Sequence, residues 1–448
     1  SAGCVLAGRL SEDASASVLL LEAGGPADAD ESKIPAAFAS LFKTRFDWNY
    51  QTTEQKHLNG QRAYWPRMKA LGGCSAMNAM IYIRGNRADY DGWRDESGCE
   101  GWGWDDVLPL FKKSEDHYRG ANEMHGAGGE WRVEKARVRW DVLDAFQKAA
   151  SEAGIPETPD FNRGSNEGVG YFEVNQKAGW RWNTAKAFLR PKCYGRPNFE
   201  MWTMAQATRL VVERQADGAL RCTGVKVWTG DELAHLTATE EVIVCAGAVN
   251  SPQLLQLSGI GPAEVLHQAG IPVTLDLPGV GANLQDHLQI RSVYKVRDAL
   301  TLNTLAASPW GKLRIGMEYL LRRSGPMSMA PSQLGAFTRS RPELEHPNLQ
   351  YHVQPLSLDA FGEPLHSFPA FTASVCNLNP TSRGTVHIKS PNFEDAPAIA
   401  PNYLSTAQDQ QVAADSLRVT RRIVSQPALA QYAPEEWKPG TQYQSDER

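Results

Sequence analysis

The chain has 448 residues, 42% of them hydrophobic and 22% charged, and its 46 basic and 51 acidic side chains leave a net charge of −5. The length suffices for two or three globular domains, and the slight acidity excludes the strongly basic surface that is typical of nucleic-acid binding. No apolar run approaches the roughly 18 residues of a membrane-spanning helix. We therefore expect no transmembrane segment, although peripheral attachment to a membrane stays open.

The seven cysteines lie between Cys4 and Cys376 without CxxC spacing. This pattern indicates reduced thiols rather than a disulfide framework or a zinc site, and it predicts a cytoplasmic protein. The chain opens directly on a helical pattern after Ser1 and stops at Arg448 after a polar stretch. We therefore expect it to be truncated at both ends.

Hydrophobic periodicity predicts the main elements in chain order. Small and aliphatic residues at helical spacing in 3–10 precede the apolar run 18–21, which suits a buried parallel strand. Residues 24–66 are loop-like, and 86–190, rich in Gly and Trp, are predicted to be a long excursion from a core sheet. The other predicted elements are a helix at 140–153, a strand at 241–247, a helix from Ser251-Pro252, strands at 292–296, 349–353 and 385–388, and helices at 311–323 and 406–425. The stripe of Val412, Ser416, Val419 and Ile423 predicts that the last helix packs on the core.

Gly3 and Glu22 fit the end of a dinucleotide-binding fingerprint. In that motif a glycine lets helix and strand pack closely, and an acid about 20 residues after the motif binds a ribose hydroxyl. The strand and the glycines that would come before Gly3 in the motif are not in this sequence. For this pair alone, an ordinary helix glycine and a surface glutamate remain an alternative.

A second pattern follows at 67–85, where Gly72-Gly73 is succeeded by small residues and then by Asn78. Two glycines without Cβ atoms allow the backbone to approach a planar ring closely, and exposed N–H groups can stabilise negative charge there. Asn78 lies in an otherwise apolar run and needs a hydrogen-bond partner, which is most often backbone.

Two further blocks complete the pattern, 245–261 with Asn250-Ser251-Pro252 and Ser258-Gly259-Ile260-Gly261, and 277–287. Together with 72–80 they resemble the two signature regions of the glucose-methanol-choline (GMC) family of FAD-dependent oxidoreductases. Shorter motifs agree in order across the chain: 101–104, 183–189 and 401–404. Within that family the chain is most similar to bacterial choline-dehydrogenase-like and alcohol dehydrogenases.

The resemblance implies an α/β fold with two domains. Residues 1–290 would form a Rossmann-like FAD-binding domain that includes the excursion at 86–190. Residues 291–448 would form a substrate-binding domain, built on an antiparallel sheet, and a truncated part of the family's C-terminal region.

The resemblance also implies the residues that hold FAD. Gly3 would lie near the pyrophosphate and Glu22 would hold the adenosine ribose. The segment against the flavin and pyrophosphate would be Leu71, Gly72, Gly73, Cys74, Asn78, Ala79 and Met80. Ala207 would meet the adenine, and Ala246 and Gly247 the adenosine end. Some relatives attach FAD covalently through a histidine at the position of Met77, so we expect non-covalent FAD here.

The activity that the resemblance implies is oxidation of a small, primary alcohol to an aldehyde, with hydride transfer to flavin N5 and a quinone or another acceptor taking the electrons. The family's catalytic histidine lies in a segment that this sequence stops short of, so we expect no catalytic residue in this chain. His287 could substitute as base, but we expect a structural histidine beside Asp286. The histidines lack metal-ligand spacing, so no metal site is predicted. Ser258 lacks the G-x-S-x-G frame of a hydrolase.

Two alternatives stay open: a lyase similar to the hydroxynitrile lyases, in which FAD has no redox turnover, and a catalytically incomplete flavin-binding fragment. A nicotinamide enzyme would explain Gly3 and Glu22 but not the other blocks. For the substrate pocket we name Phe361, His366 and Phe368 as candidates, with plain loop packing as the preferred interpretation. No aromatic cage for a quaternary ammonium group is identifiable.

Overall fold

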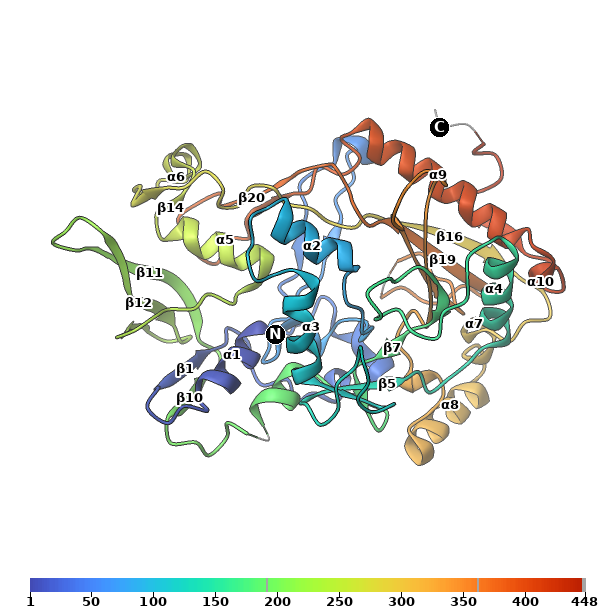
Figure 1. Cartoon of the computed structure of the whole chain (residues 1–448), viewed down its shortest axis with the longest axis horizontal. Coiled ribbons are helices and arrows are strands. Elements are labelled where there is room, and N and C mark those ends of the chain that lie inside the picture. Colours follow the sequence, from blue (N-terminus) through green and yellow to red (C-terminus); the bar gives the residue numbers. More distant parts are fainter. Residues whose placement is uncertain (191, 361, 445–448) are drawn as a thin grey trace.

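The computed structural model describes residues 1–190, 192–360 and 362–444. Figure 1 shows two regions, one with small sheets around α1, β11 and α5, and one with a large sheet beside α4 and α9. The helices are α1 (Ala2–Leu10), α2 (Arg87–Asp95), α3 (Trp104–Ser114), α4 (Asp141–Glu152), α5 (Gly247–Leu257), α6 (Ala263–Gln268), α7 (Leu302–Leu305), α8 (Pro309–Arg322), α9 (Ala407–Val424) and α10 (Pro427–Ala430).

The large sheet has six strands in the order β22-β16-β19-β18-β17-β6, and all neighbours are antiparallel. Its strands are β6 (Gly168–Tyr171), β16 (Gln289–Lys295), β17 (Leu334–Thr338), β18 (Leu349–Gln354), β19 (Ala370–Asn377) and β22 (Glu435–Lys438). The expected antiparallel sheet is therefore confirmed. Its edge strand β6 comes from the predicted excursion at 86–190, whereas the division of the chain at 290 stays a prediction.

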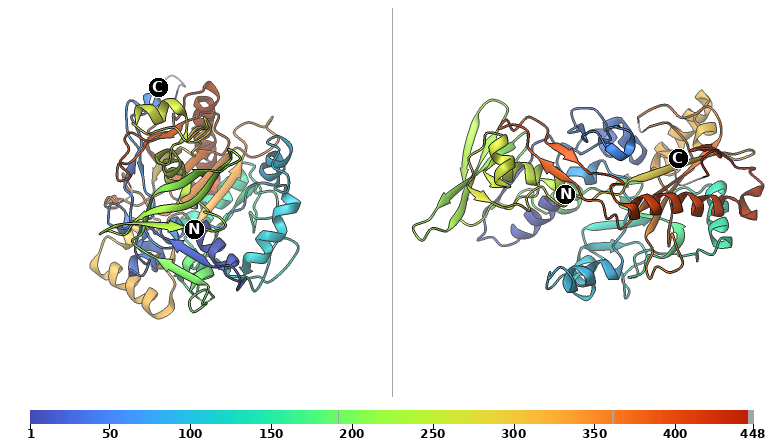
Figure 2. Two further views of the ribbon diagram at one scale, coloured as in Figure 1. Left: turned by 90° about the vertical axis from the view of Figure 1, so that its left-hand side faces the viewer. Right: turned by 90° about the horizontal axis from the view of Figure 1, so that it is seen from above.

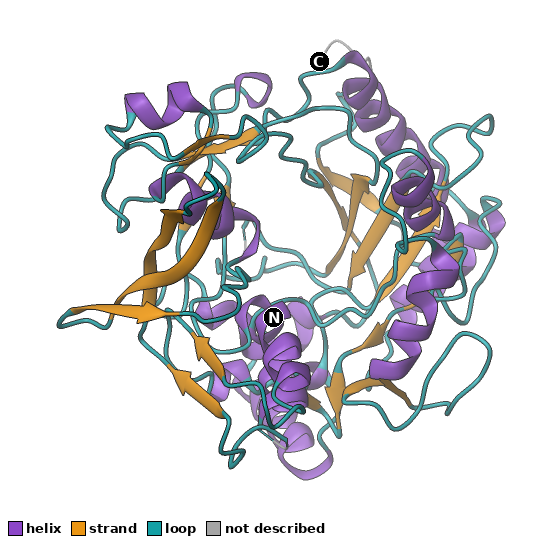
Figure 3. Ribbon diagram, turned by 60° about the vertical axis from the view of Figure 1, so that its left-hand side comes forward, coloured by secondary structure: helices purple, strands orange, loops and turns teal. Residues whose placement is uncertain are grey.

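One face of this sheet forms the main hydrophobic core with α4 and α9. Figure 3 shows these helices, in purple, covering one side of the sheet. Thr406 caps the start of α9: its side chain accepts a hydrogen bond from the Asp409 N–H (3.2 Å) and so satisfies a free donor of the first turn. The stripe predicted for this helix is buried, and the hydroxyls of Tyr351 and Thr420 meet at 2.9 Å across the interface. The prediction of a core-packing helix is confirmed.

The other region is built from smaller sheets. β1 (Val18–Leu21) pairs in parallel with β10 (Phe199–Trp202), and α1 packs beside them. The remaining paired strands of this region are β11 (Gln206–Arg214), β12 (Leu220–Trp228), β13 (Leu233–Thr237), β14 (Ile260–Gly261), β15 (Leu275–Asp276), β20 (Thr385–His387) and β21 (Ala398–Ala400). Figure 2 shows the β11–β12 ribbon extending away from the rest of the molecule.

Further short strands and turns complete the structure. The strands are β2 (Tyr50–Gln51), β3 (Tyr64–Trp65), β4 (Glu115–His117), β5 (Trp131–Lys135), β7 (Glu173–Val174), β8 (Gln176–Lys177) and β9 (Trp180–Arg181). Short 3-10 or π turns lie at Asp30–Ser32, Pro35–Leu41, Lys56–Leu58, Gly73–Ala76, Ala185–Leu189 and Pro326–Ser328. In the part of the chain that the structure describes, no helix combines the length and apolarity that crossing a bilayer requires.

The strand predicted at 241–247 is wrong. The segment is extended but unpaired, because no described residue forms a β-bridge with it and a strand needs a hydrogen-bonding partner. The helix expected from Ser251 begins four residues earlier, at Gly247, and therefore contains Pro252 in its interior. The other predicted helices and strands are confirmed within a few residues. The strand at 18–21, however, was expected to be buried and is only partly so, with Leu19 38% exposed.

Candidate functional site

The Gly72-Gly73 loop lies against the start of α1. Both glycines have positive φ, +95° and +54°, which L side chains rarely adopt. A Cβ on Gly73 would lie 2.9 Å from the backbone nitrogen of Ser1, and the Ser1 hydroxyl donates to the Gly72 carbonyl (2.8 Å). Only glycine fits at this crossing of loop and helix.

Two hydroxyl groups that the sequence did not single out hold this loop. Ser75 Oγ donates to the Gly72 carbonyl (2.7 Å) and accepts from the backbone N–H of Thr184 (3.0 Å). Thr184 Oγ1 also donates to the Gly72 carbonyl (3.2 Å). The 183–189 motif therefore packs directly on the first signature region, which explains why the two patterns occur together in one sequence.

Asn78 shapes the second half of the loop. Its Oδ1 accepts from the Met80 N–H (3.0 Å), and Met80 has a left-handed backbone with φ +60° that is strained for this residue type. The expectation that Asn78 bonds to backbone is thus confirmed. Arg181, which sequence reasoning missed, is fully buried, and its Nη1 donates to both the backbone and the side-chain oxygen of Asn78 (2.7 and 3.1 Å). Burial lowers the pKa of Arg181 to about 9.

Glu22 follows directly after the parallel strand β1, and Ala207 lies near the start of β11, the strand that follows β10. The Ala205 N–H donates to the Glu22 carbonyl (2.9 Å), and Glu22 Oε1 accepts from the Gly24 N–H (2.8 Å). Burial raises the pKa of Glu22. In parallel sheets, the crevice at the carboxyl ends of the strands is where nucleotides bind.

Gly3 joins α1 to the second signature region. A Cβ at Gly3 would lie 3.3 Å from Cys245 Cβ and 3.6 Å from Leu20 Cδ1. Ala246 and Gly247 follow Cys245, are exposed and begin α5. The close packing of helix and strand that was expected for Gly3 is present.

The predicted cofactor residues thus meet around the start of α1. Gly73 touches Ser1, and Gly3 touches the segment before Ala246. The Leu71 N–H donates to the carbonyl of Gly25 (2.9 Å), three residues after Glu22. Among the described residues no side chain caps α1, and the first backbone N–H groups of a helix are a suitable partner for a phosphate. This cradle of glycines, an uncapped helix start and a partly buried acid fits FAD. The roles of the individual residues stay predictions.

The candidates for the substrate side are not gathered into this cradle. His287 donates from Nε2 to the Leu378 carbonyl (3.0 Å), which agrees with a structural role. His366 meets Ser357 Oγ through Nδ1 (3.0 Å) and stacks on Phe368 at 4.9 Å. Phe361 lies outside the described residues.

The face of the six-stranded sheet opposite the main core lies beside the first signature region. Ile81 and Ile83, just after Met80, pack on Phe172 and Phe337 of this face. His352 is on the same face, because its β18 neighbours Tyr351 and Val353 point into the main core. Burial lowers the pKa of His352 to about 4, so the ring is neutral near pH 7. This surface is therefore a second wall beside Asn78 and Met80.

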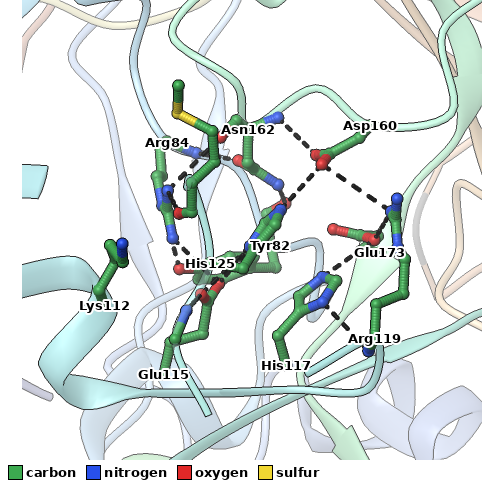
Figure 4. Close-up of polar contacts among 12 residues, drawn as sticks. Tyr82, Arg84, Lys112, Glu115, His117, Arg119, His125, Asp160, Asn162 and Glu173 are labelled. Carbon is green, nitrogen blue, oxygen red and sulfur yellow. Dashed lines mark hydrogen bonds and ion pairs between the residues drawn. The ribbon is translucent and has the colours of Figure 1, made fainter. Parts of the chain in front are cut away.

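Figure 4 shows a buried network of charged groups that sequence spacing did not reveal. The rings of His117 and His125 stack with their centroids 3.8 Å apart. One potential metal-ligating atom from each of His117, His125 and Glu173 lies within 4.8 Å of the other two. Both ring nitrogens of His125 face carboxylates, Glu115 at 3.0 Å and Asp160 at 2.8 Å. The three acids come from segments far apart in the chain, so no local motif could have indicated the cluster.

The network is balanced by cationic groups. Arg84 donates to Glu115 (3.0 Å), and Arg119 donates to Glu173. Burial opposes protonation of His125, but its hydrogen bonds to Asp160 and Glu115 raise its pKa to about 9. Burial likewise opposes ionisation of Asp160, but its hydrogen bond with His125 lowers its pKa to about 2. Cations of the protein thus already occupy the positions around these carboxylates. We interpret the cluster as a structural ion-pair network.

Comparison with known proteins agrees with this geometry. Two GMC oxidoreductase family models match residues 2–289 and 380–448. Human mitochondrial choline dehydrogenase is 40% identical over 454 residues, which cover 100% of this chain and 75% of that protein. The oxygen-dependent choline dehydrogenase of Burkholderia ambifaria is 40% identical over 452 residues, which cover 100% of this chain and 78% of the relative.

Solved structures give the same result. Pyridoxine 4-oxidase from Mesorbium loti superposes with a TM-score of 0.88 at 31% identity, covering 100% of this chain and 83% of the other. An FAD-dependent oxidoreductase from Chaetomium thermophilum superposes with a TM-score of 0.88 at 25% identity over 99% and 84% of the two chains. These relatives support FAD-dependent alcohol oxidation and give no support to the lyase alternative. The chain belongs to the GMC oxidoreductase family, whose cofactor is FAD.

Proposed function

We propose that this FAD-dependent enzyme oxidises choline or a closely related small primary alcohol to the aldehyde. The observation that carries this proposal is the 40% identity, over the whole chain, with proteins named choline dehydrogenase. FAD, when bound, supplies the acceptor for the two electrons and the hydrogen that leave the alcohol carbon. The chain's own residues then have to bind the cofactor and orient the alcohol.

The cradle residues divide the binding of FAD among them. The backbone N–H groups at the start of α1 would stabilise the pyrophosphate charge, and Gly72 and Gly73 let the loop pass close to this helix start. Glu22 would accept hydrogen bonds from ribose hydroxyls. Asn78, held by Arg181, would fix the loop under the ring system, with the face of His352 as the opposing wall.

Non-covalent FAD is part of the proposal. The side chain of Met77, at the position where some relatives carry a flavin-linked histidine, is buried in a small apolar cluster with Leu41 and Met68. A thioether in that setting does not form a bond to the flavin ring. Acid precipitation of the protein should therefore release all flavin into the supernatant, and flavin that stays with the pellet would contradict this point.

The electron acceptor and the compartment also belong to the proposal. We expect a quinone or another acceptor to reoxidise the reduced flavin. Stopped-flow absorbance with a soluble quinone analogue and with oxygen compares the two reoxidation rates. All seven cysteines are free, which supports a reducing compartment such as the cytoplasm. The catalytic histidine that the resemblance implies stays a prediction.

The direct test is anaerobic reduction of the bound flavin by a panel of alcohols. We expect choline to bleach the flavin absorbance, with ethanol, butanol and benzyl alcohol slower. Bleaching by a different alcohol in preference to choline would redirect the substrate assignment, and bleaching by none would reject alcohol oxidation. Because the readout is the flavin itself, it does not depend on knowing the electron acceptor.

A further inference from the structure

Helix α8 (Pro309–Arg322) carries an apolar stripe that points away from the protein. The three most exposed large apolar side chains among the described residues, Trp310, Leu321 and Leu320, all lie on this helix, at 79%, 73% and 62% exposure. Leu313 and Met317 continue the stripe at 53% and 44%. Singly exposed leucines are common on protein surfaces, whereas a contiguous group of five on one helix marks an interaction surface.

The stripe is not the face that attaches the helix to the molecule. Ile315 and Tyr319 are the buried side chains of α8, and the Tyr319 hydroxyl donates to the Gly179 carbonyl (3.0 Å). With 3.6 residues per turn, Leu313, Met317 and Leu320 lie on the opposite side of the helix from this pair. Figure 1 shows α8 at the lower edge of the molecule, and the left view of Figure 2 shows it projecting from the body. The exposed stripe therefore lies on a part of the surface that projects outward.

The charge of α8 differs from that of the whole chain. The helix carries Lys312, Arg314 and Arg322 against Glu318, a net charge of +2, whereas the chain carries −5. The three basic side chains are exposed. At 3.6 residues per turn Arg314 lies next to Leu321 of the stripe, and Lys312 and Arg322 flank the buried pair. A helix with Trp and Leu on one side and Lys or Arg beside them is typical of segments that lie in the interface of an anionic membrane.

We propose that α8 docks this enzyme on the surface of a membrane containing anionic lipids, with Trp310, Leu313, Met317, Leu320 and Leu321 inserted among the lipids and the basic side chains facing the headgroups. The docking itself is independent of the substrate. The purpose of the docking would be to bring the flavin enzyme to a quinone dissolved in the membrane. This purpose rests on the electron acceptor given under the proposed function.

A second copy of the chain fits this surface less well. A helix of this length is about 21 Å long and about 10 Å wide, so its outer face offers about 200 Å², far below the roughly 800 Å² per partner of a stable protein interface. In a two-fold pair the same basic side chains would also face one another. A bilayer can deform around a convex face and carries the complementary charge.

The test is flotation of the purified FAD-loaded protein with vesicles made of equal parts of phosphatidylcholine and phosphatidylglycerol. We expect the protein to float with these vesicles and to float less with pure phosphatidylcholine or at high salt. The double variant Leu320→Glu/Leu321→Glu should lower the partition coefficient by about tenfold or more, since it removes two inserted side chains and adds two negative charges. Both positions are exposed, so the fold should be retained.

The matched control is Leu110→Glu/Leu233→Glu, which introduces the same charges at two leucines of similar exposure, 61% and 56%, on α3 and β13. It should bind vesicles as the parent does. Failure of the parent to float, or equal floating of the α8 variant, would overturn the proposal. So would a dimer in solution that the α8 variant dissociates, because a second copy would then cover the stripe. Choline reduction and quinone reoxidation, measured without vesicles, report on the proposed function separately.

Discussion

The two regions of the molecule are stabilised in different ways. The six-stranded sheet with α4 and α9 has one continuous core of large buried side chains, among them Phe146, Tyr351 and Phe371. The region around α1 has small sheets, small apolar clusters and glycines at its contact points, and its segment 241–246 is unpaired. The first region thus has one core of large side chains, whereas the second relies on small residues and close backbone contacts, as we expect of a region that holds a cofactor.

The largest effect on this difference is expected from a side chain that fills the proposed cofactor cradle. Gly73→Val places a branched side chain where a Cβ already lies 2.9 Å from Ser1 N, at φ +54°. We expect the FAD content of the purified protein, measured by flavin absorbance per protein, to fall by about tenfold or more. Gly101→Val, at φ +78° with nothing within 4 Å, is the control for backbone strain alone. Wild-type flavin stoichiometry in Gly73→Val would remove this loop from the cofactor site.

The opposite variant targets the large core. Phe371 is 0% exposed and its ring stacks on Tyr294 at 5.3 Å. Phe371→Ala should lower the free energy of unfolding in urea by about 3–5 kcal/mol, because it leaves a cavity in a packed core. The folded fraction should keep its FAD, and Phe371→Leu should cost less. If FAD is lost while the fold is intact, the two regions are not as separate as the structure indicates.

The network of Figure 4 lies between the two regions. It extends from Arg84, just after the signature loop, to Glu173 beside the large sheet. The folded-state pKa of His125, about 9, lies above its ordinary value of 6.5. The stability it contributes is therefore fully present below about pH 6.5 and is lost as the pH rises through about 9, on the order of 3 kcal/mol in total.

Urea unfolding between pH 6.5 and 9.5 measures this effect. The parent should lose stability with rising pH, and His125→Gln should be less stable at pH 6.5 but show a flatter dependence. Equal slopes for the two proteins would show that His125 is not charged in the fold.

The smallest effect is expected at the ribose position. Glu22→Ala should weaken FAD binding by about 1–3 kcal/mol, the range for a lost hydrogen bond to a charged group. Fluorescence titration of the apoprotein with FAD gives the dissociation constant. Glu213→Ala, an exposed acid on β11, controls for the change in charge. An unchanged dissociation constant would take Glu22 out of the site.

Local pattern alone determined a large part of this protein. The family signatures at 72–80 and 250–261, the parallel strand 18–21 and the helices at 140–153, 311–323 and 406–425 follow from neighbouring residues, because propensity, capping and periodicity act over a few turns. Gly3, Gly72 and Gly73 could be singled out because only glycine allows such close approach.

Only the tertiary structure decided what meets across long stretches of chain. β6 enters the large sheet beside β17, the segment 241–246 finds no strand partner within the described part of the chain, and Arg181 reaches Asn78. The His117–His125 network likewise gathers its acids from three segments. On α8, periodicity shows two apolar faces but not which one is buried, because burial is set by the rest of the fold and not by the helix itself.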